Sequence, residues 1–510
     1  MDGMRLFWGD SHANLHENHI GSLADTLAFA REMVDFLPMA YYPFREYSRN
    51  GFIVEDYLPE DLLARQWRAV CEFAAASNRP GELVVFPGYE WQGDATSGDH
   101  NVFFLHDNPP LIKCDKLREL YGEIDRRGLA AMVIPHHTAY MPGIRGKDWS
   151  VHDERLSPFA EIYSHHGSSE DDGEWIGMRV NRNMGPNTSG GTIEDGLGRG
   201  YKLGIICSND SHNGLPAVYG IGTMACYARE LTREALWEGF AARRVYGVTG
   251  DRVVLDFSVN GAPMGSVIRA KGPMHITAGV RCTDALDRIE LLRNNRVIAT
   301  HCHNGTWGPP SGGERIRCKL RVEAGWNPNP ERLPNQGDRH WHGRIEVPDG
   351  VIVSVEKCWR TMGQRVDKPG GRRCDFEFRT EQGTGLQTES TVFELEARPA
   401  DKVVIQIDNK RVEMSLAEAM RGSRLVDFME ENFDLVGRTF GIDARSLTRK
   451  ERIYFLGPKC KIHRAVPAAG LVGGLEFVEQ TPPAGANHYR IRVTQRNRQM
   501  AWSSPVWVEE

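Results

Sequence analysis

Short apolar runs alternate with amphipathic helical patterns along the first 250 residues of the chain. Seven runs have the length and composition of strands, and they cover residues 4–10, 34–42, 82–91, 129–137, 159–166, 202–210 and 219–228. Apolar residues recur with a helical period over residues 22–36, 59–77, 114–128 and 232–244. This alternation is typical of βα units and predicts an α/β fold with a largely parallel sheet. Seven strands of this kind either close into a distorted barrel or form an open, doubly wound sheet.

From about residue 250 the pattern changes to alternating apolar and polar positions without long helical stretches. Turn signals occur at Asn260-Gly261 and Asn294-Asn295. The pattern predicts a mostly antiparallel β-sandwich, to which the last residues of the chain also belong. Residues from about 325 to 480 mix strand-like runs with a helical pattern over 415–437, which indicates an inserted or elaborated region. The expected domains are therefore residues 1–250 and 251–510.

Charge and cysteine usage exclude several classes of protein. The formal net charge is −6 and no lysine-rich run occurs, so the chain lacks the cationic field that binds nucleic acids. The ten cysteines form no CxxC pair, which disfavours a zinc ribbon or a disulfide framework and indicates reduced thiols. The N-terminal stretch lacks the pattern of a signal peptide, and no run of about 18 apolar residues occurs. We therefore expect a cytoplasmic protein that binds neither nucleic acid nor a membrane.

Histidine and carboxylate residues gather at the ends of the predicted strands. Eleven of the 18 histidines lie at or before residue 212. The residues at or just beyond five strand ends are Asp10 and His12, Glu90 with His100 in the following loop, His136 and His137, His165 and His166, and Asp210 and His212. The carboxyl ends of the strands meet at one face of a parallel α/β fold, so these side chains are expected to lie close together. Each one alone is typical of a polar loop, but five strand ends together indicate a shared metal centre.

The residue types at these strand ends suit divalent metal ions. Neutral imidazole nitrogen and carboxylate oxygen are ligands for Zn²⁺, Mn²⁺ or Fe²⁺. The candidate ligands exceed what one catalytic ion needs, so a dinuclear centre fits the pattern, with Glu90 as the natural bridging carboxylate. Two neighbouring ions generate hydroxide at neutral pH and stabilise the charge that develops on the attacked centre. The pattern therefore predicts metal-assisted hydrolysis, with Asp210, Glu90 and His137 as candidate catalytic residues.

Five segments of the chain resemble the successive metal-binding motifs of the PHP (polymerase and histidinol phosphatase) superfamily: WGDSH, GYEW followed by DHNVFF, VIPHH, EIYSHHG and SNDSH. The resemblance implies a distorted seven-stranded βα barrel with two or three metal ions and, in most members, phosphoesterase activity. Residues 243–265 and 499–508 are similar to a PHP-like branch with a C-terminal β-domain, the domain-of-unknown-function family 3604. The resemblance covers about residues 4–320 and 486–510.

The resemblance also implies a set of metal ligands. The matching positions are His12 in the first motif, Glu90 as the bridging glutamate and His100 after it, then His136, then His165 or His166, and finally Asp210 and His212. Two positions depart from the family pattern. Asn14 stands where the first motif has a second histidine, and Tyr41 and Tyr42 replace an Asp-His pair. These losses predict one or two divalent ions, Zn, Mn or Fe, rather than three.

Polar residues near the expected mouth of the site are candidates for binding substrate. Arg45 and Arg179 can pair with a phosphate or a carboxylate, although each also fits a solvated surface position. Tyr41 and Tyr140 can donate to an oxyanion. The segment 164–200 is long, rich in glycine and poor in apolar residues. It is predicted to be a functional loop over the site or, alternatively, a disordered segment.

The motifs and the resemblance together predict a PHP-like metal-dependent hydrolase of a small-molecule substrate. The attacked group is a phosphoester or a carbonyl-type group in an amide, an ester or a lactone. The alternative is a non-catalytic binding protein built on a degenerate PHP-like barrel, because ligands are lost at positions 14 and 41–42. The sequence leaves open the substrate, the identity of the metal and whether the chain forms a homo-oligomer.

Overall fold

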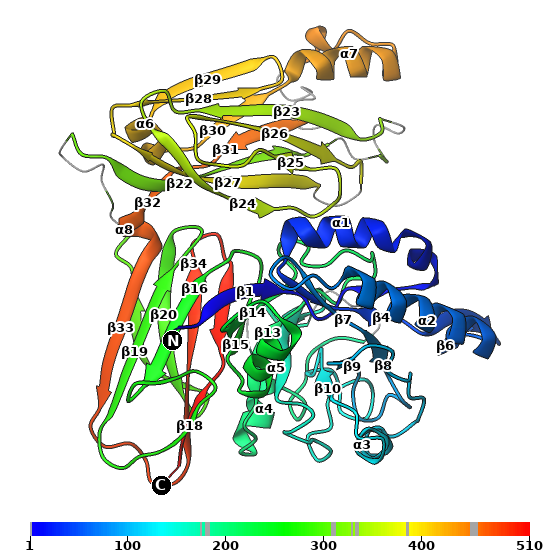
Figure 1. The fold of residues 1–510 in the computed structure, drawn as a ribbon. Helices are drawn as coiled ribbons and strands as arrows, with labels where there is room; N and C mark the ends of the chain where they lie inside the picture. The colour runs from blue at the N-terminus through cyan, green and yellow to red at the C-terminus, as the bar shows by residue number, and fades with distance from the viewer. Residues whose placement is uncertain are drawn as a thin grey trace. The chain divides into compact units, whose positions relative to one another are not determined.

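The chain folds into two compact units (Figure 1). The computed structural model describes residues 3–173, 176–178, 184–305, 307, 313–327, 330–331, 336–383, 387–448 and 457–509. Unit 1 comprises Met1–Cys282, Leu286–His303 and Gly473–Glu510, and unit 2 comprises Thr283–Ala285 and Asn304–Val472. The main path of the chain therefore leaves unit 1 after His303 and returns to it at Gly473. The division at about residue 250 and the elaborated region at about 325–480 stay predictions.

Strands and helices alternate in the first 250 residues of unit 1. The helices are η1 (Glu17–Ser22), α1 (Leu23–Met33), α2 (Glu60–Ser77), α3 (Leu117–Arg126), α4 (Ile193–Gly198) and α5 (Arg233–Ala241). The strands are β1 (Arg5–Gly9), β2 (Asn14–Leu15), β3 (Phe36–Pro38), β4 (Ala40–Tyr41), β5 (Phe44–Arg49), β6 (Phe52–Tyr57), β7 (Val84–Phe86), β8 (Gly88–Trp91), β9 (His100–Phe104), β10 (Ala131–Pro135), β11 (Phe159–Ser164), β12 (Gly167–Ser168), β13 (Gly204–Cys207), β14 (Thr223–Ala228) and β15 (Val245–Val248). Each predicted strand segment contains a strand and each predicted helical pattern contains a helix, so the mixed α/β character is confirmed.

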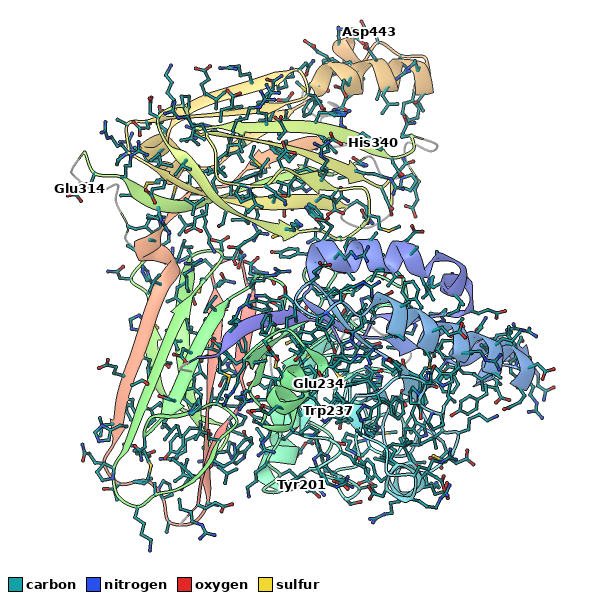
Figure 2. All side chains as sticks on the ribbon, viewed as in Figure 1. Tyr201, Glu234, Trp237, Glu314, His340 and Asp443 are labelled. Atoms are coloured by element: carbon teal, nitrogen blue, oxygen red, sulfur yellow. The ribbon has the colours of Figure 1, made fainter. Side chains whose placement is uncertain are left out.

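Helix α2 illustrates how the apolar period positions a helix. Leu63, Trp67, Val70 and Ala74 recur at helical spacing and are buried. Glu60 and Asp61 lie in the first turn, where carboxylates stabilise the positive end of the helix dipole. Figure 2 adds the side chains of the described residues, with Glu234 and Trp237 marking helix α5. None of the described helices is long and apolar enough to cross a membrane.

The described strands of this region belong to four separate sheets. Strands β1, β3 and β7 pair in parallel, and β14 and β15 extend the same sheet in antiparallel orientation. The other three sheets have the strand orders β10-β9-β8-β4-β2, β12-β11-β13 and β5-β6. Their ladders do not close into a ring among the described residues, so the seven-stranded barrel is not confirmed.

Strand β9 is the main difference from the predicted topology. It lies between β8 and β10 and pairs antiparallel with both, which interrupts the parallel order. His100 is the first residue of this strand, so its prediction as a loop residue was wrong. The apolar stretch that follows His100 is too short for its periodicity to distinguish a strand from a loop.

The later part of unit 1 is an antiparallel β-structure with one parallel pair at its edge. Its strands are β16 (Val254–Val259), β17 (Ala262–Pro263), β18 (Val267–Arg269), β19 (Met274–Arg281), β20 (Leu286–Arg293), β21 (Arg296–Cys302), β33 (Val472–Glu479), β34 (Asn487–Gln495), β35 (Met500–Ser503) and β36 (Val506–Glu509). Buried and exposed positions alternate strictly along β19, as expected for a strand with one face in the core. Asn260 and Asn294 have positive φ values of 49° and 47° and turn the hairpins β16–β17 and β20–β21.

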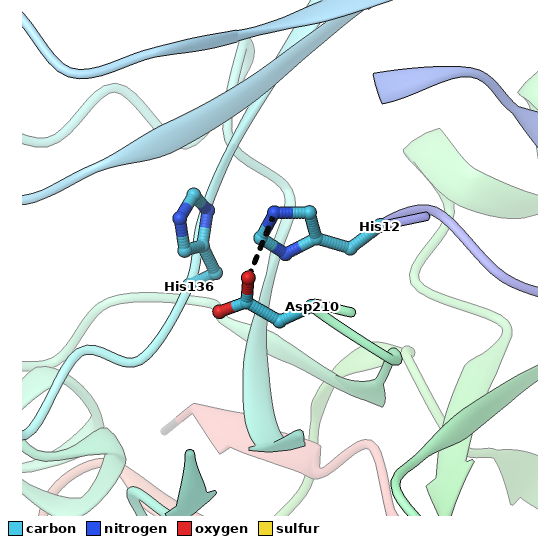
Figure 3. A group of neighbouring side chains, drawn as sticks. All are labelled: His12, His136 and Asp210. Carbon is cyan, nitrogen blue, oxygen red and sulfur yellow. Dashed lines mark ion pairs between the residues drawn. The ribbon is translucent and has the colours of Figure 1, made fainter. Parts of the chain in front are cut away.

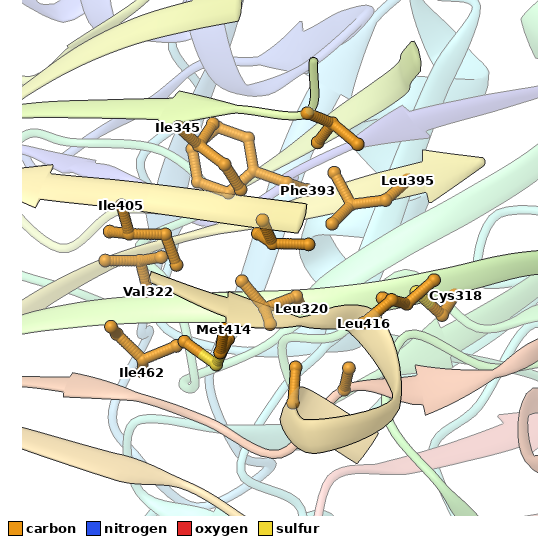
Figure 4. Packing of buried hydrophobic residues seen from close by; sticks show 14 of the residues in the cluster. Cys318, Leu320, Val322, Ile345, Phe393, Leu395, Ile405, Met414, Leu416 and Ile462 are labelled. Carbon is orange, nitrogen blue, oxygen red and sulfur yellow. The ribbon is translucent and has the colours of Figure 1, made fainter. Parts of the chain in front are cut away.

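Unit 2 consists of two antiparallel sheets and short helices. Its elements are β22 (Ile316–Gly325), β23 (Arg339–Glu346), β24 (Val351–Cys358), β25 (Arg365–Val366), β26 (Arg373–Thr380), β27 (Thr388–Ala397), β28 (Lys402–Ile407), β29 (Lys410–Ser415), α6 (Leu416–Arg421), β30 (Arg424–Asp427), α7 (Met429–Phe440), η2 (Ala444–Ser446), β31 (Lys459–Ile462), β32 (Val466–Pro467) and α8 (Ala468–Leu471). Figure 4 shows Leu320 and Phe393 from one sheet packed with Ile345 and Ile405 from the other. This apolar layer is the core of unit 2.

Candidate metal centre

Asp10 fixes, through hydrogen bonds, the backbone of the segment just after β1 in which His12 lies. Its carboxylate is fully buried and accepts backbone N–H groups of His12 at 3.0 Å, Asn209 at 3.0 Å and Ala217 at 2.7 Å. Burial raises the pKa of Asp10, and the three donors oppose this shift. Asp10 thus joins the segment after β1 to the segment after β13, and backbone donors engage both of its oxygens.

His12 lies at the centre of a buried cluster (Figure 3). Its Nε2 is 3.3 Å from Oε2 of Glu90 and 3.3 Å from Oδ1 of Asp210. Its Nδ1 is 3.4 Å from Oε2 of Glu161, a residue of β11. The three carboxylates come from different strand ends or strands, so the cluster forms only when the strands associate.

His136 and His137 enter the cluster from the end of β10. The ring centroid of His136 is 4.1 Å from that of His12, and its Nε2 is 3.9 Å from Oε1 of Glu90. Neither ring nitrogen of His136 has a hydrogen-bond partner among the described residues, and Nδ1 of His137 has none either. His137 has a φ of 33°, which non-glycine residues rarely adopt and which is characteristic of functional sites.

Asp210 follows β13 and contacts imidazoles on two sides. Besides the contact with His12, its Oδ2 lies 3.0 Å from Nε2 of His166. Its φ is 52°, a second strained backbone position within the cluster. Nδ2 of Asn14 donates to Oδ1 of Asp210 at 3.3 Å. The amide that stands in place of the second motif histidine therefore contacts the same carboxylate.

His165 and His166 were open alternatives, and only His166 lies in the cluster. His165 is exposed, whereas His166 is buried and its Nδ1 is 2.7 Å from the hydroxyl oxygen of Tyr140. The loop that carries Tyr140 folds back tightly. A Cβ at Gly146 would lie 1.8 Å from the carbonyl oxygen of Tyr140, so this close approach requires glycine.

Sequence reasoning missed two buried carboxylates of the cluster, Asp99 and Glu161. Oδ2 of Asp99 lies 3.5 Å from Nε2 of His137 and accepts a hydrogen bond from Nη1 of Arg145 at 2.8 Å. Burial raises the pKa of Asp99 to about 7 in spite of Arg145. Oε1 of Glu161 accepts the backbone N–H of His137 at 3.3 Å. A carboxylate inside the apolar run of β11 was an available signal, because such residues are rarely buried without a role.

His100 is engaged by other protein groups. Its Nδ1 is 2.9 Å from the carbonyl oxygen of Gly98, and its Nε2 is 3.3 Å from Nζ of Lys147. Lys147 is itself buried, and burial lowers its pKa to about 7. The role of His100 as a metal ligand stays a prediction.

Tyr41, predicted to bind substrate, packs away from the cluster. Its hydroxyl donates to Oε1 of Gln66 at 2.9 Å, and its ring stacks on Trp67 of α2. Tyr42 instead contacts His16, with ring centroids 4.3 Å apart. Adjacent residues of an extended segment point to opposite sides, so Tyr42 is the tyrosine of this pair near the site.

Arg45, Arg179 and His212 complete the predicted set. Arg45 forms an ion pair with Glu17 at 2.6 Å. The His212 side chain is 45% exposed; its Nδ1 is 2.7 Å from Nε2 of His16, and its Nε2 is 3.9 Å from Oδ1 of Asp210. Arg179 lies outside the described residues.

Among the residues that the structure describes, three overlapping groups of buried side chains have the spacing that a metal ion requires. They are His12, His136 and Asp210; His137, His166 and Asp210; and Asp99, His136 and His137, with the ligand atoms of each group within 4.8 Å of one another. A buried nitrogen without a partner is destabilising by about 1–3 kcal/mol, so the unpartnered His136 ring fits a bound ion. Asp210 belongs to two of the groups and is the shared carboxylate.

Burial and mutual contacts set the protonation of the cluster. Burial alone would lower the pKa of His12, but Asp210 and Glu161 raise it well above its usual value, so an ion that binds His12 would displace its proton. Burial alone would raise the pKa of Asp210, but His12 and His166 hold it well below its usual value. Burial lowers the pKa of His136 well below its usual value and that of His137 to about 3. His136 and His137 are therefore neutral, which is the form that binds a metal ion.

Comparison with known proteins finds distant relatives of undescribed function. No protein-family model matches the chain. An uncharacterised protein of Chlamydia pneumoniae is 23% identical over 274 residues, and uncharacterised proteins of Chlamydia muridarum and Chlamydia trachomatis are 26% identical over 280 and 281 residues. These matches cover 50–51% of this chain and 43–44% of the relatives, so the chain spans less than half the length of the curated relatives it matches.

Among solved structures, the chain is similar to a two-domain protein from Bacteroides vulgatus that contains a predicted PHP-like metal-dependent phosphoesterase. The similarity covers 81% of this chain and 96% of that chain, with 11% sequence identity and a TM-score of 0.34. A TM-score of this size is too low to establish a shared fold. Membership of the PHP superfamily and of the 3604 family therefore stays a prediction.

Proposed function

We propose that the protein is a metal-dependent hydrolase that attacks a phosphoester or a carbonyl-type group of a small molecule. The observation that carries the proposal is the buried His136 ring, whose two unpartnered nitrogens lie between carboxylates and imidazoles at metal-ligand spacing. Two strained residues, His137 and Asp210, belong to the same cluster. The resemblance of the strand-end motifs to the PHP superfamily supports a PHP-like barrel and favours phosphoester hydrolysis.

The cluster offers ligands for two ions of zinc, manganese or iron. His12, His136 and Asp210 would hold one ion, and His137, His166 and Asp210 a second. Glu90 is proposed as an additional carboxylate ligand of the ions, since its Oε2 lies 3.3 Å from Nε2 of His12. Such ions, when bound, acidify a water molecule and polarise the phosphoryl or carbonyl oxygen.

Neighbouring residues orient these ligands. Glu161 lies beside Nδ1 of His12, and the Tyr140 hydroxyl lies beside Nδ1 of His166, so in both rings Nε2 faces the shared Asp210. Partners of this kind fix the ring orientation and the tautomer of a metal-binding histidine. Asp210 is the proposed proton acceptor, because its carboxylate belongs to both ligand groups, beside which the attacking water would lie.

The first test is the metal content of protein purified without an affinity metal, measured by plasma mass spectrometry. We expect one to two equivalents of zinc, manganese or iron in the parent, loss in the His136→Ala variant and retention in His106→Ala, which alters an exposed histidine of the same unit. Loaded protein is then assayed with phosphoester, amide and ester substrates. A metal-free parent that also fails to bind added Mn²⁺ or Zn²⁺ overturns the proposal and leaves the non-catalytic binding protein.

A further inference from the structure

An open pocket of about 830 Å³ adjoins the metal cluster in unit 1. Residues that line it include His16, Glu17, Tyr42, Phe44, Glu46 and His212. Two contacts connect it to the cluster. Nε2 of His212 lies 3.9 Å from Oδ1 of Asp210, and the Tyr42 hydroxyl accepts a hydrogen bond from Gln92, which also donates to Glu90. The pocket therefore lies beside the cluster, linked to it by residues that contact both.

Four rings form the inner wall of the pocket. The Tyr42 ring centroid is 4.3 Å from that of His16, 5.3 Å from that of His212 and 5.3 Å from that of Phe44. His16 and His212 are also linked directly through Nε2 and Nδ1 at 2.7 Å. Rings at these separations and tilts present both faces and edges, which suits offset or edge-to-face contact with another aromatic ring.

The charges at the rim disfavour a second anionic group. Glu17 and Glu46 bring two carboxylates, and the guanidinium of Arg45 is already paired with Glu17 at 2.6 Å. Among the described lining residues the charged groups therefore sum to one net negative charge when the imidazoles are neutral.

We propose that this pocket binds the non-reacting part of the substrate and that this part is a flat aromatic ring without negative charge. The inference rests on the proposed function, since the hydrolysed group would lie at the metal cluster and the ring beside Tyr42 and Phe44. It names a substrate class: aryl or arylmethyl phosphoesters, esters or amides rather than sugar phosphates or polyphosphates. Burial of a ring against other rings supplies both affinity and orientation.

The test compares non-hydrolysable phosphonates that share one anchoring group. Isothermal titration calorimetry on the metal-loaded protein measures phenylphosphonate, methylphosphonate and 4-carboxyphenylphosphonate. Phenylphosphonate is expected to bind about tenfold or more tightly than methylphosphonate because it buries a ring. The 4-carboxy compound is expected to bind more weakly than phenylphosphonate. Glu46→Gln removes one carboxylate from the pocket and is expected to reduce the difference in affinity between these two compounds. Phe44→Leu keeps an apolar side chain but removes a ring, so it should weaken only the two aryl compounds.

The outcomes separate this inference from the proposed function. Equal binding of phenylphosphonate and methylphosphonate overturns the aromatic pocket and leaves the metal site standing. Tighter binding of the 4-carboxy compound overturns the uncharged ring. Failure of all three to bind protein that retains its metal overturns the inference and the phosphoester part of the proposed function, whereas a parent without metal affinity overturns the whole proposed function in the earlier test.

Discussion

His165 and His166 are adjacent in the chain, yet only His166 points into the metal cluster. Nε2 of His166 lies 3.0 Å from Oδ2 of Asp210, whereas His165 is exposed and joins the neighbouring segment through its backbone N–H to Asn209. The two residues follow the end of β11, where the chain turns toward β12. Substitution of His166 is therefore expected to affect the metal cluster, whereas the same substitution of His165, one position earlier, is not.

The His166→Ala variant is expected to lose metal affinity by about tenfold or more, because one imidazole of a ligand group is removed. His165→Ala is the control and is expected to bind metal as the parent does. Competition with a chromogenic chelator measures both affinities. Equal loss in the two variants would show that the turn itself, rather than the His166 ring, matters for binding.

Tyr140 is expected to act by orienting His166. Tyr140→Phe removes the hydroxyl that lies 2.7 Å from Nδ1 of His166 and leaves the buried ring in place. Loss of such a partner typically lowers metal affinity or activity by about 10–100-fold. The matched control is Tyr121→Phe, which removes a buried hydroxyl that contacts Ser157 and no residue of the cluster. A Tyr140→Phe protein with the metal affinity of the control would contradict an orienting role.

A buried ion network connects strand β34 to the segment that follows His166. Arg490 is fully buried; its Nη1 contacts Oε1 of Glu170 at 2.5 Å, and its Nη2 contacts Oε1 of Glu194 at 2.6 Å. Burial alone would raise the pKa of Glu170, but Arg490 and Arg492 lower it. The carboxylate thus depends on these guanidinium groups to stay ionised inside unit 1.

Arg490→Met is expected to lower the free energy of unfolding of unit 1 by about 3 kcal/mol, because it leaves the buried Glu170 with less positive charge beside it. Urea denaturation measures the change. Arg126→Met, which breaks an exposed pair with Glu123 on α3, serves as the control and should leave the midpoint unchanged. If the two variants unfold at the same urea concentration as the parent, the network does not stabilise the unit.

The apolar pattern was sufficient to predict the strand segments and the residues at their ends. His12, His136 and Asp210 each follow a predicted strand, and the structure brings them into one group. Strand ends are visible in a sequence because a buried apolar run stops abruptly at a polar residue. The sheet connectivity was not visible, because β9 pairs antiparallel with β8 and β10 and its short sequence does not specify a partner.

Contacts between distant residues account for the rest of what the sequence did not reveal. Lys147 reaches Nε2 of His100 from 47 positions further along the chain, which no local pattern indicates. The choice between Tyr41 and Tyr42 depends on which side of the segment faces α2, and this follows only from packing. Asp99 and Glu161 lay within or beside the quoted motifs, but their roles depend on contacts with His137 and His12.

The stability of unit 2 is expected to depend on pH through Glu389 of β27. Its carboxylate is buried and accepts the backbone N–H groups of Arg360 at 2.8 Å and Thr361 at 3.0 Å. Burial raises the pKa of Glu389 from 4.5 to about 7, and these donors do not fully oppose it. Because the folded state binds the proton more tightly, the contribution of Glu389 is fully present below about pH 4.5 and is lost as the pH rises through about 7.

Glu389→Gln keeps the size of the side chain and removes its charge, but its NH2 group replaces one of the two oxygens that accept backbone N–H groups. The variant is expected to be less stable than the parent near pH 4.5, and its stability relative to the parent is expected to rise by up to about 3 kcal/mol above pH 7, from the size of the pKa shift. Denaturant unfolding of unit 2 across this pH range measures the difference. Glu377→Gln, a change at a half-exposed carboxylate of β26, is the control and should show no such pH dependence. A constant difference between Glu389→Gln and the parent across the range would mean that Glu389 titrates normally, because only a raised pKa makes the stabilisation grow with pH.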